Sequence, residues 1–139
     1  MKAYRRQVQY YETDMMGITH HSNYIRWMEE ARIDFMDQMG FPYKKMEQEG
    51  VISPVRAVNC CYKQSTRFGD GIEIMVAVKE FNGVVLTLRY EMKNAESGAV
   101  VCTAESEHVF LDRSMRFIRM KRDMPDFYAA LMELAEEKK

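Results

Sequence analysis

The chain has 139 residues, 47% of them apolar, which is enough for one domain with a buried core. Its 20 basic and 21 acidic residues leave a net charge of -1, which disfavours a globally charged nucleic-acid binder. No apolar run approaches the ~18 residues that a membrane span needs, and the N-terminal residues lack the apolar segment of a secretory signal. We therefore expect a cytoplasmic protein that binds neither nucleic acid nor membrane.

Sulfur-containing residues are numerous, with 13 methionines and three cysteines. Cys60, Cys61 and Cys102 are odd in number and two are adjacent, which does not indicate a disulfide framework. We interpret them as reduced thiols, either small buried groups or, at one position, a nucleophile. The methionines are interpreted as core filler or as a pliable wall for a flexible apolar ligand.

The first half of the chain predicts a strand followed by a long helix. Residues 3–11 have strand-like composition, and a helix is expected from Ser22 or Asn23, either of which can cap it, to Met39. Gly40 ends this helix. Its apolar residues recur at three- and four-residue steps, and Ile25, Ile33 and Met36 widen the stripe. The main stripe is Tyr24, Trp27, Met28, Ala31, Phe35 and Met39.

The second half predicts strands joined by short turns. Residues 51–65 indicate one strand, and residues 72–79 alternate between apolar and other side chains. Asn82-Gly83 predicts a hairpin in which both turn residues have positive φ. Further strands precede and follow the turn at residues 94–98, and a C-terminal helix is expected over about residues 124–137. Successive hairpins make these strands antiparallel, and the long helix is the expected cover for the sheet.

The stretch "YYETDMMGITHHSNYIRWMEEAR" resembles the signature of the 4-hydroxybenzoyl-CoA thioesterase family. The resemblance implies an α+β hotdog fold, in which a curved antiparallel sheet wraps around one long central helix. With the C-terminal helix added, we expect a single hotdog thioesterase domain over residues 1–139. The positions that match the family signature are Asp14, Gly17, His21, Asn23, Tyr24, Trp27, Glu29 and Arg32.

The resemblance implies an acyl-CoA thioesterase, with Asp14 as the general base or the nucleophile. On local pattern alone, Asp14 is instead a cap for the turn before Gly17. The donor to the oxyanion is expected to be the backbone N–H of His21, where the helix begins and its dipole is positive. Gly17 is expected to allow a close approach of the chain.

The imidazole of His21 has two interpretations, as an acid or base that assists Asp14 or as a cap-region side chain. His20 stands where relatives carry an aromatic residue, and we interpret it as a packing substitute. No cysteine or histidine spacing resembles a zinc site, so no metal is expected. No cofactor is expected either, because CoA is part of the substrate.

Substrate-binding residues are expected near this motif and near the C-terminus. Met15, Met16, Tyr24 and Glu29 are assigned to the acyl region, although Glu29 can equally form a helix ion pair with a neighbouring arginine. The hairpin at Asn82-Gly83 lacks the basic residues that many relatives place near CoA. The basic run at residues 113–122 is therefore assigned to the CoA phosphates through Arg116 and Arg119, or else it is a solvated face.

Two other functions fit the same motif. A non-catalytic acyl-CoA sensor or carrier keeps the pocket without turnover, and an acyl-carrier-protein thioesterase acts on a different thioester. The resemblance also implies a homodimer or homotetramer, formed by edge-to-edge pairing of sheets, with the site between subunits. Unpaired sheet edges require such cover.

Overall fold

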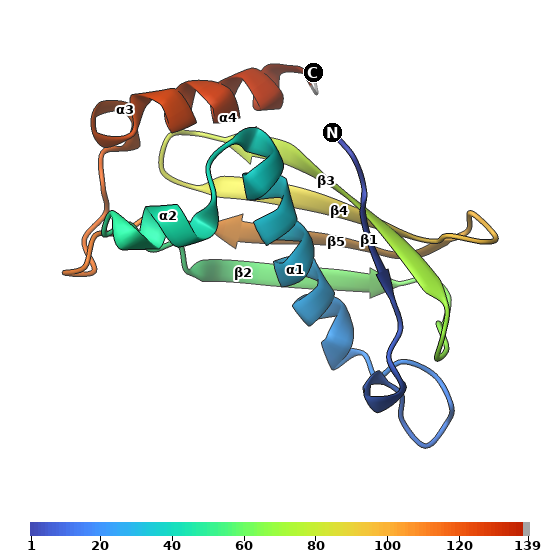
Figure 1. The fold of residues 1–139 in the computed structure, drawn as a ribbon. Helices are drawn as coiled ribbons and strands as arrows, with labels where there is room; N and C mark the ends of the chain where they lie inside the picture. The colour runs from blue at the N-terminus through green and yellow to red at the C-terminus, as the bar shows by residue number, and fades with distance from the viewer. Residues whose placement is uncertain (138–139) are drawn as a thin grey trace. The chain divides into compact units, whose positions relative to one another are not determined.

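The structure is a computed structural model that describes residues 1–137, and Figure 1 shows its helices and strands. The N-terminal part contains β1 (Tyr4–Gln7), the 3₁₀ helix η1 (Tyr10–Glu12), the long helix α1 (Ser22–Met39) and the short helix α2 (Tyr43–Gln48). The strands β2 (Val55–Tyr62), β3 (Gly71–Phe81), β4 (Leu86–Asn94) and β5 (Val100–His108) follow. The chain ends with α3 (Met120–Asp123) and α4 (Pro125–Glu137).

The five strands form one antiparallel sheet in the order β1-β3-β4-β5-β2. β1 pairs with β3, and Tyr4 lies opposite Ile74. β2 occupies the other edge, directly after Pro54, a residue that sheets tolerate only at such places. Together with α1 and the C-terminal helix α4, this sheet confirms the expected α+β class.

The hairpin between β3 and β4 is present, but its turn differs from the expected one. Gly83 has a φ of +91°, whereas Asn82 does not adopt positive φ: among the described non-glycine residues only Met115 does. The Asn82 side chain instead accepts hydrogen bonds from the N–H groups of Val84 and Val85, at 2.9 and 2.8 Å. The loop is therefore longer than a two-residue turn, because the asparagine caps it through its side chain rather than its backbone.

The chain divides into two compact units, each with its own buried residues. Unit 1 comprises Met1–Phe35, Asn59–Val76 and Tyr90–Ala104. In this unit Trp27 and Ala31 of α1 are fully buried, as are Ile72 and Ile74 of β3. The main apolar stripe of α1 is thus confirmed within unit 1.

The expected widening of that stripe is wrong at two positions. Ile25 and Ile33 are 45% and 39% exposed. Arg32, in contrast, is only 7% exposed and has polar partners within the described residues. The buried face of α1 is therefore narrower than the apolar content of the helix indicates.

Unit 2 comprises Met36–Val58, Ala77–Arg89 and Glu105–Lys139, with residues 138 and 139 outside the described range. Its core contains α4, whose Phe127 and Leu131 are fully buried. The Phe127 ring contacts the rings of Phe41 and Phe110, with centroids 4.9 and 5.6 Å apart. The expected C-terminal helix is confirmed, and the short helix α3 before it was not predicted.

Within residues 1–137, no helix combines the length and the apolar character required to cross a membrane. The expectation of a single domain over residues 1–139 stays a prediction.

Candidate active site

The motif after η1 folds as a small hairpin within unit 1. Thr13 bridges to Thr19 in antiparallel fashion, and the Asp14 N–H donates to the Ile18 carbonyl at 2.9 Å. The Gly17 N–H closes the turn on the Asp14 carbonyl at 3.0 Å, while Asp14 Oδ1 accepts the Met16 N–H at 2.8 Å. One carboxylate oxygen of Asp14 therefore caps the turn.

The backbone conformation of residue 17 requires glycine. Gly17 has a φ of +80°, a left-handed conformation that other residues rarely adopt. A Cβ added there would meet no protein atom within 4 Å. The turn thus requires glycine for its conformation, and the expected close approach of the chain at this position stays a prediction.

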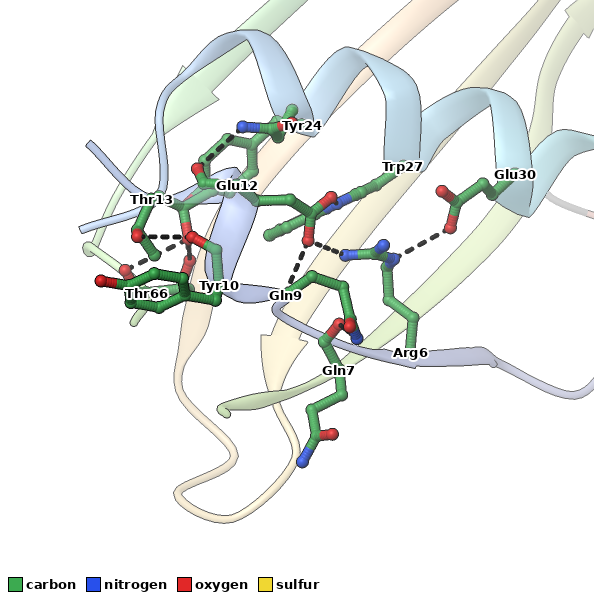
Figure 2. Close-up of polar contacts among 12 residues, drawn as sticks. Arg6, Gln7, Gln9, Tyr10, Glu12, Thr13, Tyr24, Trp27, Glu30 and Thr66 are labelled. Carbon is green, nitrogen blue, oxygen red and sulfur yellow. Dashed lines mark hydrogen bonds and ion pairs between the residues drawn. The ribbon is translucent and has the colours of Figure 1, made fainter. Parts of the chain in front are cut away.

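A buried carboxylate, Glu12, holds the start of this hairpin. Figure 2 shows Glu12 between Arg6 and Trp27: it accepts hydrogen bonds from Arg6 Nη1 at 2.7 Å and Trp27 Nε1 at 2.9 Å. It also accepts the Gln9 N–H at 2.8 Å. Arg6 is shared, because its Nε contacts Glu30 at 2.9 Å. The Glu12 side chain is only 4% exposed, so these bonds replace water.

Burial alone would raise the pKa of Glu12, because it disfavours the charged form. The hydrogen bonds from Arg6, from the Gln9 N–H and from Trp27, with the charge of Arg6, outweigh burial and lower that pKa. Glu12 is therefore a buried charge with a full set of partners rather than a candidate proton donor.

The C-terminal end of the hairpin is also held by Glu12, through its backbone. The Glu12 carbonyl accepts the His20 N–H at 2.8 Å and the Asn23 side-chain amide at 2.9 Å. The Thr19 and Thr66 hydroxyls hydrogen-bond at 2.6 Å, and the Thr19 N–H donates to the Thr66 carbonyl at 2.8 Å. The Tyr24 hydroxyl lies 3.0 Å from the Thr66 hydroxyl and hydrogen-bonds with it. Both ends of the loop are thereby fixed at the entrance to α1.

The N-terminus of α1 is capped by a histidine. His20 Nδ1 lies 2.9 Å from the Ser22 hydroxyl and accepts the Ser22 N–H at 3.2 Å. The expected cap by Ser22 or Asn23 is wrong, because the Asn23 amide is used as a donor to Glu12 and His20 carbonyls. His20 also stacks on His21, with ring centroids 4.3 Å apart.

Within the described residues, this arrangement leaves the backbone N–H of His21 without a partner. Among residues 1–137 it donates no hydrogen bond. The His21 carbonyl accepts the Tyr24 N–H at 3.3 Å and the Tyr62 hydroxyl at 3.3 Å, which fixes the orientation of the residue. An unpaired N–H at the positive end of a helix is a site for an oxygen that gains negative charge.

A cavity of about 330 Å³ in unit 1 brings these features together. Asp14 and His21 both line it, with Tyr24 and Tyr62 as aromatic walls. The Tyr62 ring packs against Tyr24 and His21 at centroid distances of 5.1 and 6.2 Å. The remaining lining residues are Met16, Ile18, Thr19, Lys63, Gln64 and Ser65.

Residues 8–133 match the thioesterase-like superfamily. The chain belongs to that superfamily. The family resemblance, the hotdog fold and the class of enzyme, a thioester hydrolase, are confirmed.

Relatives of this thioesterase-like protein include proteins named for acyl-CoA hydrolysis. YneP of Bacillus subtilis (strain 168), provisionally named an acyl-CoA thioesterase, is 34% identical over 89% of this chain and 90% of its own length. The acyl-CoA thioester hydrolase YbgC of Escherichia coli O6:H1 is 28% identical over 66% of this chain and 68% of its own. The structure of a DHNA-CoA thioesterase from Staphylococcus aureus superimposes with a TM-score of 0.92 at 32% identity, over 99% of this chain and 95% of that chain.

The cavity gathers some of the predicted site residues of this thioesterase and not others. Asp14, Met16, His21 and Tyr24 line it. Met15, fully exposed, is not among the lining residues, so its assignment to an acyl pocket is not supported by this geometry.

The remaining predicted contacts are not among the lining residues of the cavity. Glu29 is exposed on α1 and is not a lining residue of the cavity. Arg116 and Arg119 are exposed residues of unit 2, whereas the cavity belongs to unit 1. Within the described part of the chain, no group of three histidine, cysteine or acidic residues is arranged to hold a metal ion.

Sequence reasoning missed two features of the site. Glu12 lies next to the recognised motif, but its burial depends on Arg6 and Trp27, which are distant from it in sequence or on another element. Tyr62 is the last residue of β2 and Lys63 follows it, more than forty residues after Asp14, and no local signal joins them to the motif. A second cavity, of about 260 Å³, lies in unit 2 and is lined by residues of α2 and α4, none of which belongs to the motif.

We predict that Glu12→Gln lowers the free energy of unfolding at pH 7 by about 2 kcal/mol, the scale of a lost charged hydrogen bond. Because the pKa of Glu12 is lowered on folding, its contribution is present above the unfolded pKa and disappears as pH falls through the folded pKa. Urea unfolding from pH 7 to pH 3 checks this. The difference in the free energy of unfolding between wild type and Glu12→Gln should become smaller as pH falls. The exposed control Glu96→Gln should have the same free energy of unfolding as the wild type at each pH.

Proposed function

We propose that this protein hydrolyses an acyl-CoA thioester to a free carboxylic acid and CoA. The observation that carries the proposal is that Asp14 and His21 line one cavity, and that the His21 N–H donates no hydrogen bond within residues 1–137. The names of YneP and YbgC support the same reaction.

Asp14 is the proposed general base or nucleophile. Its Oδ1 is occupied by the Met16 N–H, which orients the carboxylate, while Oδ2 accepts no hydrogen bond from residues 1–137. As a base, Oδ2 takes a proton from water as that water attacks the thioester carbon. As a nucleophile, it attacks the carbon directly, CoA thiolate leaves, and water hydrolyses the resulting anhydride. Both routes end in acid and CoA.

The His21 N–H is the proposed donor to the thioester oxygen. That oxygen becomes negative when the carbonyl carbon is attacked, and the helix dipole adds to the stabilisation. One such donor contributes ~2.7–4 kcal/mol to the transition state. The Tyr62 hydroxyl and the His20 cap hold the surrounding backbone, so the N–H is oriented before substrate binds. The His21 imidazole also lines the cavity and is the proposed assistant in proton transfer.

The acyl group that we propose is aromatic rather than a flexible aliphatic chain. Tyr24, Tyr62 and His21 are lining residues of the cavity, whereas Met15 is not. The name of the Staphylococcus aureus relative, a DHNA-CoA thioesterase, supports a substrate with a ring system. Lys63, Gln64 and Ser65 supply polar groups in the same cavity for oxygen atoms of such a substrate.

We predict that Asp14→Asn lowers kcat for acyl-CoA hydrolysis by at least about 100-fold, the scale of general-base catalysis. Asparagine keeps the acceptor oxygen for the Met16 N–H, so the turn should survive. CoA release is measured with a thiol reagent over a panel of aromatic and aliphatic acyl-CoAs. Asp112→Asn is the matched control, because Asp112 caps an exposed loop in the same way through the Ser114 and Arg116 N–H groups.

Three outcomes of that experiment separate the functions. Tight acyl-CoA binding without Asp14-dependent release would identify a sensor or carrier. The same thiol assay is repeated with acyl-carrier-protein thioesters, and release from these but not from acyl-CoA would show that the carrier protein, rather than CoA, carries the acyl group of the substrate. Equal loss in Asp112→Asn would refute a specific role for Asp14.

We propose that Arg116 and Arg119 contact the CoA phosphates, supported by their exposed guanidinium groups in a basic run. Arg116→Gln with Arg119→Gln should raise KM about tenfold with kcat nearly unchanged, because the phosphates are remote from the reacting bond. Initial-rate kinetics at low salt check this. Arg89→Gln, which removes another exposed arginine of unit 2, is the control, and an unchanged KM in the double variant would disprove the assignment.

We propose a homodimer, or a tetramer built from such dimers, in which β2 pairs with a second copy. Seven of the eight residues of this edge strand are exposed, and unpaired edges promote pairing. Tyr62 at the end of β2 lines the cavity, which places the edge beside the site. A cytoplasmic location is also proposed, supported by three cysteines that form no disulfide.

The predicted consequence is that activity falls when the protein is diluted to monomer. A partner strand beside Tyr62 would complete the wall of the cavity, so the isolated subunit should be inactive. Sedimentation velocity and specific activity over the same concentration range test this together. Full activity of a monomer would refute the shared site.

A further inference from the structure

Thr66 is a fully buried residue that holds the loop of residues 13–19, which carries Asp14. Its carbonyl accepts the Thr19 N–H at 2.8 Å, and its hydroxyl lies 2.6 Å from the Thr19 hydroxyl. Among residues 1–137, all other hydrogen bonds of this loop stay within residues 10–19. Thr66 is therefore the one described residue from a distant part of the sequence that hydrogen-bonds with the loop.

The same side chain is attached to α1. The Tyr24 hydroxyl lies 3.0 Å from the Thr66 hydroxyl, so Thr66 connects the loop to the helix that follows it. Thr66 is not a lining residue of the cavity with Asp14, whereas Thr19 and Tyr24 are. Any effect of Thr66 on the reaction must therefore pass through these two neighbours.

The three hydroxyl groups satisfy one another when each proton is used once. The Thr19 hydroxyl donates to the Thr66 carbonyl at 3.2 Å. The Thr66 hydroxyl then donates to the Thr19 oxygen, and the Tyr24 hydroxyl donates to the Thr66 oxygen. Because Thr66 is 0% exposed, water does not compete for these bonds, and removal of one hydroxyl leaves buried polar groups unsatisfied.

The other group proposed for catalysis, the His21 N–H, has separate supports. The His21 carbonyl accepts the Tyr62 hydroxyl, and His20 accepts the Ser22 N–H at the start of α1. Neither of these hydrogen bonds includes Thr66. Loss of the Thr66 hydroxyl should therefore displace the loop that carries Asp14 relative to a donor that stays in place.

We propose that Thr66 is a positioning residue for the hydrolysis proposed above, on which this inference rests. Thr66 holds Thr19, and Thr19 pairs across the hairpin with Thr13, the residue before Asp14. The Asp14 carboxylate is thereby kept in register with the His21 N–H. A displacement of about 1 Å can lower a rate about 100-fold. A buried hydroxyl that restricts such a displacement therefore raises kcat without touching the substrate.

Thr66→Val tests the hydroxyl, because valine keeps the shape of the side chain and the backbone carbonyl can still accept the Thr19 N–H. We expect kcat for CoA release to fall about tenfold, with KM within about twofold of the wild-type value. Thr66→Ser restores a hydroxyl and should recover kcat to within about threefold of the wild type. Thr87→Val is the matched control, because it changes a half-buried threonine of unit 2, and it should behave as the wild type does.

A double-mutant cycle with Asp14→Asn separates positioning from a general loss of folded protein. If Thr66 acts by placing the Asp14 carboxylate, adding Thr66→Val to Asp14→Asn should change kcat by less than about twofold. Partial unfolding would instead lower kcat by the same factor in both backgrounds. Circular dichroism and urea unfolding verify that each variant is folded in the assay. If Thr66→Val does not fold, Thr19→Val takes its place, because it removes the other hydroxyl of the pair.

Several results would overturn the inference. A wild-type kcat in Thr66→Val would exclude any role of the hydroxyl, and an equal loss in Thr66→Ser would show that side-chain size is the cause. Equal losses in both backgrounds of the cycle would make Thr66 a purely structural residue. Failure of the proposed function looks different: the wild type releases no CoA, or Asp14→Asn has no effect, and the role of Thr66 is then refuted with it.

Discussion

Glu12 is a charge taken out of water, and the geometry of the candidate site depends on how that charge is satisfied. Its carboxylate accepts hydrogen bonds from Arg6 of β1, from the backbone before η1 and from Trp27 inside α1. Moving a carboxylate from water into the protein interior costs several kcal/mol, and only a full set of hydrogen-bonding partners offsets that cost. These partners come from separate elements, so satisfying Glu12 fixes those elements relative to one another within unit 1.

The backbone of Glu12 extends this constraint to the loop that carries Asp14. Its carbonyl accepts the His20 N–H, while the loop from Thr13 to Thr19 closes on itself as a hairpin. The loop that carries Asp14 therefore begins and ends at one anchored residue. A surface loop alone has few packed contacts, so this anchoring supplies the support that a proposed functional carboxylate on a turn needs.

The structure orients the two groups proposed for catalysis, the Asp14 carboxylate and the His21 N–H, in different ways. The turn engages one oxygen of Asp14, and the other has no partner among residues 1–137, so the turn orients the carboxylate without neutralising it. The His21 N–H is unpaired because the first turn of any helix leaves donors unsatisfied. His20 and Tyr62 satisfy or orient the groups around it and leave that one donor available. A thioester between them would meet a base and a donor that need no rearrangement.

The amino-acid sequence by itself determined the elements and the local motif. The three- and four-residue spacing of Tyr24, Trp27 and Met28 specifies α1, and the Asn82-Gly83 turn places β3 beside β4, because both signals are local and repeat at the period of the backbone. Asp14, Gly17 and His21 were identified because they lie within one short stretch of sequence.

Only the tertiary structure decided which distant residues complete the site. Glu12 is buried because Arg6 and Trp27 approach it, Tyr62 reaches His21 across forty-one residues, and Ile25 stays exposed although its side chain is apolar. In each case the outcome depends on what packs against the residue from another element. Hydrophobic periodicity does not carry that information, because burial and hydrogen bonding are properties of the folded neighbourhood.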